Sequence, residues 1–155
     1  MASSRVVIPS PLGALEIVTA NDAITALNWT DDDRISHAPN LPLLQAASRQ
    51  LSAYFDDPKQ TFDLPLAPEG EPFEQAVWRE MLSIPSGMTC TYGDIAKTLA
   101  KPAQAVGGAC GRNPIPVIIP CHRVVGAGDR LTGYSGKGGV ETKRWLLQHE
   151  GALLI

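Results

Sequence analysis

A cysteine followed directly by two basic side chains is the part of the sequence best suited to covalent chemistry. Cys121 comes after the apolar run 117–119 and before His122 and Arg123. A thiol reacts as its thiolate, and a histidine base or nearby positive charge favours that form. A buried, unreactive thiol is the commoner role for a cysteine taken alone. Because of these neighbours, we predict that Cys121 is the reactive nucleophile of an intracellular enzyme.

The position of His122 limits how it could assist the thiol. Adjacent side chains in an extended segment point to opposite faces, so we do not expect His122 to bond directly to Cys121. It could act through a water molecule if a carboxylate held its ring in place. Glu150, in the last predicted helix, is the obvious partner, and Glu141 remains an alternative.

The composition indicates an ordinary globular protein of the cytoplasm. Hydrophobic residues make up 44% and charged residues 19% of the 155 residues. We find no apolar run of the roughly 18 residues that a membrane span needs, and no signal peptide. Cys90, Cys110 and Cys121 are odd in number and unclustered, which argues against a disulfide framework. They lack zinc-ligand spacing, so we expect no metal and no cofactor.

Charge and composition divide the chain near residue 70. Residues 1–70 have a net charge of −5 and residues 71–155 a net charge of +2. We predict an N-terminal unit with a small β-sheet over 5–30, a helix over 41–55 and a short strand at 62–64. The fold class is therefore α/β (α+β), with a structural domain at 1–70 and a mainly helical domain at 71–155.

The second half reads as a series of short helices. A helix is expected over 73–82, with Trp78 and Leu82 facing inward. Thr91 and Asp94 have the spacing of a capping box, so another helix should run to about residue 100. Pro102 breaks it, and a glycine-rich helix over 103–111 follows. Two short helices joined by a tight turn suggest a helix-turn-helix.

The segments after these helices should place the cysteine. Residues 117–119 are expected to form a buried strand or extended segment that leads into Cys121. A last helix is predicted over 141–150, with Trp145 and Leu146 on its buried side and Gly151 at its end.

Residues 73–151 resemble the O6-alkylguanine-DNA alkyltransferases, also called methylated-DNA–protein-cysteine methyltransferases. The N-terminal 70 residues are similar to the family only in general character. The matching motifs, in chain order, are FEQAVW at 73–78, TYGDIA at 91–96, AVGGA at 105–109, NP at 113–114, IPCHRV at 119–124, GYSG at 133–136 and WLLQHEG at 145–151.

The resemblance implies irreversible DNA repair. The family flips a damaged nucleotide out of duplex DNA and transfers its O6-alkyl group to a cysteine, which would be Cys121 and would react only once. His122 would relay the proton of Cys121, through water, to Glu150. Asn113 would brace the turn before the active-site strand, and Tyr92 would donate a proton or hydrogen bond to the guanine.

The resemblance also implies a pocket and a DNA-contacting surface. The glycine-rich helix would enter the minor groove, which suits small side chains. The implied pocket residues are Tyr134, Ser135, Val124 and Gly136, and the implied DNA contacts are Gln104, Ala105, Gly108, Ala109, Arg112 and Arg123.

The sequence departs from the family at Gln104, where an arginine normally fills the space left by the flipped base. An alternative is therefore an alkyltransferase-like lesion-binding protein with weak repair activity. A helix-turn-helix transcription factor and a cysteine hydrolase fit the motifs less well. We expect double-stranded DNA containing O6-alkylguanine as the partner, possible alkylthymine repair, no membrane partner, and a cytoplasmic monomer that could bind DNA cooperatively.

Overall fold

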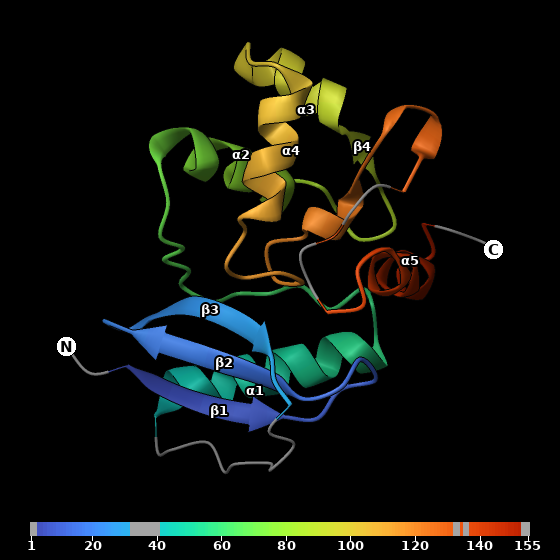
Figure 1. The fold of residues 1–155 in the computed structure, drawn as a ribbon. Coiled ribbons are helices and arrows are strands. Elements are labelled where there is room, and N and C mark those ends of the chain that lie inside the picture. Colours follow the sequence, from blue (N-terminus) through green and yellow to red (C-terminus); the bar gives the residue numbers. More distant parts are fainter. Residues whose placement is uncertain (1–2, 32–40, 132–133, 135–136, 153–155) are drawn as a thin grey trace. The chain divides into compact units, whose positions relative to one another are not determined.

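The computed structural model describes residues 3–31, 41–131, 134 and 137–152. The chain forms two compact units, Met1–Glu69 and Gly70–Ile155, which Figure 1 colours from blue to green and from green to red. The first unit holds the sheet, and the second holds most of the short helices. The expected α+β fold is confirmed.

The first unit is built on a three-stranded antiparallel sheet, in the order β1 (Ser4–Ile8), β2 (Leu15–Ala20) and β3 (Ala23–Trp29). Along β2, buried and half-buried residues alternate, as expected of a sheet with one face on a core. The tight turn between β2 and β3 uses Asn21 and Asp22 at φ of 53° and 62°, a conformation that these two residue types tolerate well.

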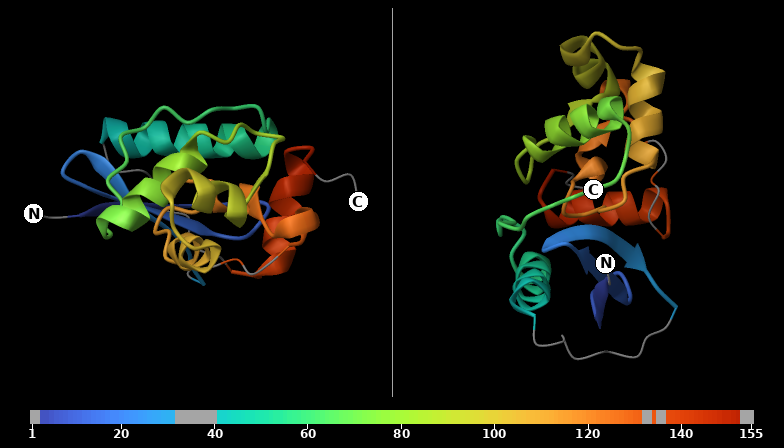
Figure 2. Two further views of the ribbon diagram at one scale, coloured as in Figure 1. Left: turned by 90° about the horizontal axis from the view of Figure 1, so that it is seen from above. Right: turned by 90° about the vertical axis from the view of Figure 1, so that its left-hand side faces the viewer.

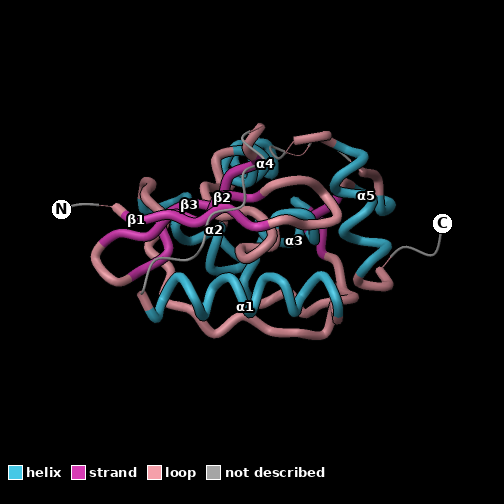
Figure 3. The backbone as a smooth tube through the Cα atoms, turned by 90° about the horizontal axis from the view of Figure 1, so that it is seen from below, coloured by secondary structure: helices cyan, strands magenta, loops and turns pink. Residues whose placement is uncertain are grey.

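One long helix, α1 (Pro42–Asp56), lies along the sheet (Figure 3). Its buried side chains recur at helical spacing, so the stripe faces the strands. These buried residues are Leu44, Ala47, Leu51 and Tyr54.

The strand predicted at 62–64 is wrong. The only strand-like pairing after α1 in the described part of this unit is an isolated bridge between Ile24 and Leu66. In it, Ile24 N donates to Pro65 O and Ala67 N donates to Ile24 O, both at 2.8 Å. Two prolines in this stretch lack the N–H that a longer ladder needs, which limits the pairing to one bridge.

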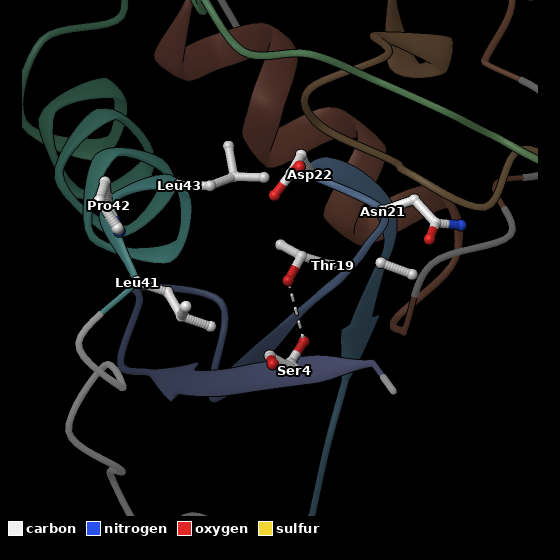
Figure 4. Close-up of a pocket in the computed structure, with 8 residues that line it drawn as sticks. Ser4, Thr19, Asn21, Asp22, Leu41, Pro42 and Leu43 are labelled. Atoms are coloured by element: carbon white, nitrogen blue, oxygen red, sulfur yellow. Dashed lines mark hydrogen bonds between the residues drawn. The ribbon is translucent and has the colours of Figure 1, made fainter. Parts of the chain in front are cut away.

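A surface hollow of about 280 Å³ lies where the sheet meets the start of α1 (Figure 4). Thr19 Oγ1 donates to Ser4 O at 3.4 Å across its floor. Among the described residues, no thiol or histidine lines it, so this hollow is not a candidate for the chemistry of Cys121. The lining residues are Ser4, Thr19, Ala20, Asn21, Asp22, Leu41, Pro42 and Leu43.

Three helices, α2 (Pro72–Leu82), α3 (Tyr92–Leu99) and α4 (Ala103–Gly111), pack together in the second unit (Figure 2). The predicted capping box at α3 is confirmed: Asp94 N donates to Thr91 Oγ1, and Thr91 N donates to Asp94 Oδ2. These bonds fix where α3 begins.

The inward orientation predicted for Leu82 is wrong, because this side chain is 46% exposed. Leu82 is the last residue of α2 and lies just past the packed turns of the helix. The buried apolar face of α2 consists instead of Val77, Trp78 and Met81.

Helix α4 contains three glycines and has low intrinsic helix propensity. Tertiary contacts hold it. Trp78 is buried, and its Nε1 donates to Ala109 O at 2.9 Å. Val106, Ala109 and Cys110 form the buried face of α4.

The segment before Cys121 is buried but is not a strand. Val117 has φ of 73°, and Ile119 N donates to Ile115 O at 2.9 Å, so the chain turns here. Cys121–Arg123 then forms a short 3-10 helix, η1, instead of the extended segment that we expected. The apolar run correctly indicated burial, but burial does not distinguish a strand from a packed turn.

A two-stranded parallel pairing follows η1. It joins β5 (Val124–Val125) to β4 (Cys90–Thr91), which leads directly into α3. The cysteine segment is thereby held beside the start of α3. A further 3-10 turn, η2, covers Ala127–Asp129.

The last helix is α5 (Val140–His149), and Gly151 ends it at φ of 78°, as predicted. Leu146 is fully buried, as expected. Trp145 is only half-buried and stacks on His149, with ring centroids 4.9 Å apart. The predicted burial of Trp145 is therefore only partly correct, since this side chain lies at the edge of the packed face.

Candidate active site around Cys121

Asn113 braces the turn that carries the chain from α4 to the cysteine. This side chain is buried, its Nδ2 donates to Ile119 O at 2.8 Å, and Ile115 N donates to its Oδ1 at 2.9 Å. Both ends of the amide thus bond to the backbone on either side of the turn. An aspartate or leucine could not make both bonds.

Behind the cysteine, three charged or ionisable side chains converge. His122 Nε2 lies 2.8 Å from Glu150 Oε2, and neither side chain is exposed. Arg123 donates from Nε to Glu150 Oε1 at 2.8 Å and from Nη2 to Glu150 Oε2 at 2.9 Å. Glu150 is therefore the carboxylate partner of His122, whereas Glu141 is exposed at the start of α5.

This arrangement fixes the tautomer of His122. A carboxylate only accepts hydrogen bonds, so Nε2 carries the hydrogen that points to Glu150. Nδ1 is buried and has no hydrogen-bond partner among the residues that the structure describes. Burial lowers the pKa of His122, although the bond to Glu150 opposes this effect. The ring is thus a neutral base with its accepting nitrogen at Nδ1.

The thiol of Cys121 is 4% exposed, and burial raises its pKa. A hydrogen bond from the Asn113 side chain and the charge of Lys143 oppose that rise in pKa. We expected Arg123 to favour the thiolate, but its guanidinium is bound to Glu150 and to Ile84 O, the latter at 2.6 Å. The resting thiol therefore keeps its proton until a base takes it.

Arg123 was also expected to contact DNA. Its side chain is only 12% exposed, and all three guanidinium nitrogens donate within the protein. This leaves little surface for a phosphate. We therefore reassign Arg123 from DNA contact to the support of Glu150.

Lys143 is a functional candidate that our sequence reasoning missed. It is 1% exposed, and its Nζ donates to the Tyr92 hydroxyl at 3.3 Å and lies 5.6 Å from the centre of that ring. Burial lowers the pKa of Lys143, and negative charge on Cys121 or Cys110 would raise it. The sequence carried one signal for this residue. Lys143 precedes Leu146 by three positions, a spacing that places both side chains on the same, buried face of α5.

The two other thiols are poor candidates for the nucleophile. Burial raises the pKa of Cys90 to about 11 and the pKa of Cys110 to about 12. The Cys110 Sγ lies 3.7 Å from the Met81 Sδ in the packing between α2 and α4. Neither cysteine has a histidine base among its described hydrogen-bond partners.

One face of α4 borders a shallow surface hollow of about 410 Å³, which we call the α4 hollow. Four of the expected DNA contacts line it, whereas Ala109 does not. Ala109 is fully buried and its carbonyl accepts from Trp78, so its predicted DNA contact is wrong for the side chain. The lining residues are Phe73, Pro102, Gln104, Ala105, Gly108 and Arg112.

The residues that we expected to line the pocket belong to β5 or to the part of the chain that follows it. Val124 is buried in β5, and Tyr134 is half-buried. The expected roles of Ser135 and Gly136 concern residues outside the described part of the chain.

Within the described ranges, no group of three or more His, Cys, Asp or Glu side chains is placed to hold a metal ion. In the same ranges, no helix has the length and apolar character needed to cross a membrane.

Two family profiles match nearly the whole sequence. The DNA-binding domain of 6-O-methylguanine DNA methyltransferase matches residues 72–152, and its ribonuclease-like domain matches residues 5–68. The methylated-DNA–protein-cysteine methyltransferase of Methanosarcina acetivorans is 40% identical over 153 residues, covering 94% of this chain and 97% of the relative. That of Mycobacterium tuberculosis is 41% identical over 149 residues, covering 92% and 89%.

Solved structures agree with these matches. The crystal structure of Mycobacterium tuberculosis O6-methylguanine methyltransferase has a TM-score of 0.83 and 38% identity, covering 97% of this chain and 94% of that one. The Mycobacterium tuberculosis OGT in complex with DNA has a TM-score of 0.80 and 41% identity, covering 94% and 91%.

Proposed function

Because the chain belongs to the 6-O-methylguanine DNA methyltransferase family, we propose that Cys121 takes the alkyl group of O6-alkylguanine in duplex DNA. The protein is a DNA-repair methyltransferase that transfers an alkyl group from DNA to its own cysteine. The observation that carries the assignment to Cys121 is the buried contact of His122 with Glu150, directly beside this thiol in the sequence. It supplies the one base that a protonated, buried thiol needs.

Proton removal comes first in the proposed mechanism. The thiol proton of Cys121 passes through a bridging water to Nδ1 of His122, which accepts it because Nε2–H is already committed to Glu150. Glu150 then stabilises the imidazolium that forms. Arg123 balances the charge of Glu150 and holds both its oxygens in place.

Alkyl transfer is a single displacement. The sulfur of Cys121 bonds to the alkyl carbon, the bond from that carbon to O6 breaks, and its electron pair stays on the guanine. Tyr92 donates a proton or hydrogen bond to the guanine ring, and Lys143 holds the Tyr92 hydroxyl. The product is a thioether, which has no ready leaving group, so each chain reacts once.

The damaged base must leave the helix to reach a buried thiol, at a cost of a few kcal/mol. We propose that α3 and α4 act as a helix-turn-helix and that α4 presents Ala105 and Gly108 to the minor groove. Tyr134, Ser135, Gly136 and the backbone of Val124 would then line the pocket for the flipped base.

The lesion-binding alternative is not favoured. Relatives of about 40% identity that span most of the chain are named methyltransferases, and Cys121 is present. Gln104 is proposed to change how firmly the duplex is held open, without removing the chemistry.

We also propose a division of labour between the two parts of the chain. Residues 71–155 would bind DNA and transfer the alkyl group, and residues 1–70 would have a structural role. Three free cysteines suit a reducing compartment, which supports a cytoplasmic protein. We propose that it acts as a monomer.

Intact mass after incubation with O6-methylguanine duplex tests the proposal. The wild-type chain should gain one methyl group, and Cys121→Ala should gain none while keeping its melting temperature within a few degrees. Cys90→Ala and Cys110→Ala serve as matched controls and should still be methylated. Methylation of Cys121→Ala, or turnover without an adduct, would contradict the assignment.

A further inference from the structure

The first turn of α5 holds the three residues that come just before the helix. Thr142, in this first turn, is buried, and its Oγ1 donates to Lys137 O. Backbone N–H groups of the same turn donate to the carbonyls of Gly138 and Gly139 at 3.2 and 3.1 Å. Residues 137–139, which we call the pre-helix turn, are therefore fixed to α5 by two backbone bonds and by the hydroxyl of Thr142.

The backbone of the pre-helix turn fits closely around the Thr142 hydroxyl. Gly138 has φ of 86° and Gly139 has φ of 55°, values that glycine adopts without strain. A Cβ at Gly138 would overlap Thr142 Oγ1, so glycine is needed for the turn to approach α5 this closely. Two glycines in succession have little conformational preference of their own, and the bond to Thr142 restricts them.

Thr142 is also the neighbour of the residue that holds Tyr92. Lys143 follows it in α5, is 1% exposed, and donates from Nζ to the Tyr92 hydroxyl at 3.3 Å. Tyr134 lies three positions before Lys137 in the chain, and its hydroxyl oxygen is buried. The start of α5 thus supports both Tyr92 and the segment that continues from Tyr134, the two aromatic residues that we propose to contact or enclose the guanine.

We propose that Thr142 is a positioning residue that limits the size of the alkyl group that Cys121 accepts. The pre-helix turn continues directly from the proposed pocket residues at 134–136, so fixing the turn to α5 limits how far that part of the pocket can yield. Without the hydroxyl, the turn can move away from α5 and from Lys143, which leaves room for a larger group. The inference rests on the proposed function and makes its substrate range more specific.

The preference for a large over a small alkyl group tests this role. We would measure the second-order rate constants for O6-benzylguanine and O6-methylguanine as free bases, by intact mass, so that DNA binding does not contribute. Thr142→Val replaces the hydroxyl by a methyl group of similar size and should raise the benzyl-to-methyl ratio about fivefold. This factor is equivalent to about 1 kcal/mol, the usual net contribution of one hydrogen bond. An unchanged or lowered ratio would overturn the proposal.

Two further variants separate the hydrogen bond from a general loss of stability. Thr142→Ser keeps the hydroxyl and should return the ratio to within about twofold of the wild-type value. Gly138→Ala keeps Thr142 but places a Cβ where its hydroxyl lies, so the ratio should rise as in Thr142→Val, and this variant decides the matter if Thr142→Val does not fold. A raised ratio in Thr142→Ser, or an unchanged ratio in Gly138→Ala, would contradict a role for the hydroxyl.

Thr98→Val is the matched control. Thr98 is an exposed threonine of α3 whose Oγ1 donates to Asp94 O at 3.2 Å, so the same chemical change removes a similar bond elsewhere. Its ratio should equal that of the wild-type chain. A rise as large as that in Thr142→Val would show that the effect is not specific to the pre-helix turn.

The inference and the proposed function can fail separately. If the wild-type chain is alkylated by neither free base nor by O6-methylguanine duplex, the proposed function is overturned. If the wild-type chain is alkylated normally and Thr142→Val has the same ratio, only the role of Thr142 is overturned.

Discussion

Replacing Glu150 by glutamine should test the contacts of Glu150 with His122 and Arg123, next to the nucleophile Cys121. The change removes one charge with almost no change of shape. It leaves Arg123, whose side chain is 12% exposed, without the carboxylate that it contacts twice at 2.8 and 2.9 Å. Removing one partner of a buried ion pair costs about 3–5 kcal/mol. For a chain of this size, that loss lowers the melting temperature by roughly 6–20 °C.

The same change should also slow alkyl transfer. In Glu150→Gln, the amide oxygen would take the place of Oε2, which accepts from both His122 Nε2 and Arg123 Nη2, and the introduced NH₂ would face Arg123 Nε as donor against donor. The neutral amide no longer stabilises the imidazolium that forms when His122 takes the proton of Cys121. A general base contributes about 10²–10⁴-fold to a rate, and the variant should lose a large part of that factor.

Glu141→Gln is the matched control, because it makes the same chemical change at an exposed position in the first turn of α5. Differential scanning calorimetry gives the melting temperature, and quenched-flow intact mass gives the methylation rate well below it. Circular dichroism should show that both variants are folded at the assay temperature. If Glu150→Gln melts and reacts like Glu141→Gln, the reasoning about His122 and Arg123 is refuted.

Three further predictions follow from the same geometry. Burial holds the pKa of His122 below 6.5, so unfolding takes up a proton in acid, and the free energy of unfolding should fall by up to about 1.4 kcal/mol per pH unit below about pH 6.5. Urea titrations should show a shallower fall for His122→Gln, and equal slopes would count against a buried neutral ring. Lys143→Met should keep or raise the melting temperature, since it removes a buried charge, yet slow methylation about tenfold or more; an unchanged rate would exclude a role for Lys143. Gln104→Arg should tighten duplex binding about tenfold at low salt and steepen the salt dependence by about 0.9, and unchanged binding would place Gln104 away from the DNA.

Local signals in the sequence predicted the helices of the second unit well. The spacing of Thr91 and Asp94 marked the start of α3, and Pro102 marked the break before α4. These features depend on neighbouring residues, which a sequence shows directly. The pairing of His122 with Glu150 was also predicted, because a motif resemblance carries information on distant contacts that spacing lacks.

Features that depend on packing were not predictable in this way. The turn at Val117 and the 3-10 helix at Cys121 need the Asn113 brace and the pairing of β4 with β5. Lys143 was overlooked because a lysine is usually exposed, and only its buried surroundings reveal it. The ion pair of Glu74 with Arg112 joins residues 38 positions apart and has no local signature.

Peptide mapping of the methylated protein tests the central claim most directly. After reaction with an excess of O6-methylguanine duplex, the peptide that contains Cys121 should carry one methyl group per chain, and the DNA should return unmodified guanine in equal amount. Two results would contradict the account of Cys121 as a nucleophile that reacts once. One is a methyl group on Cys90 or Cys110, and the other is restoration of more guanine in the DNA than there are protein chains.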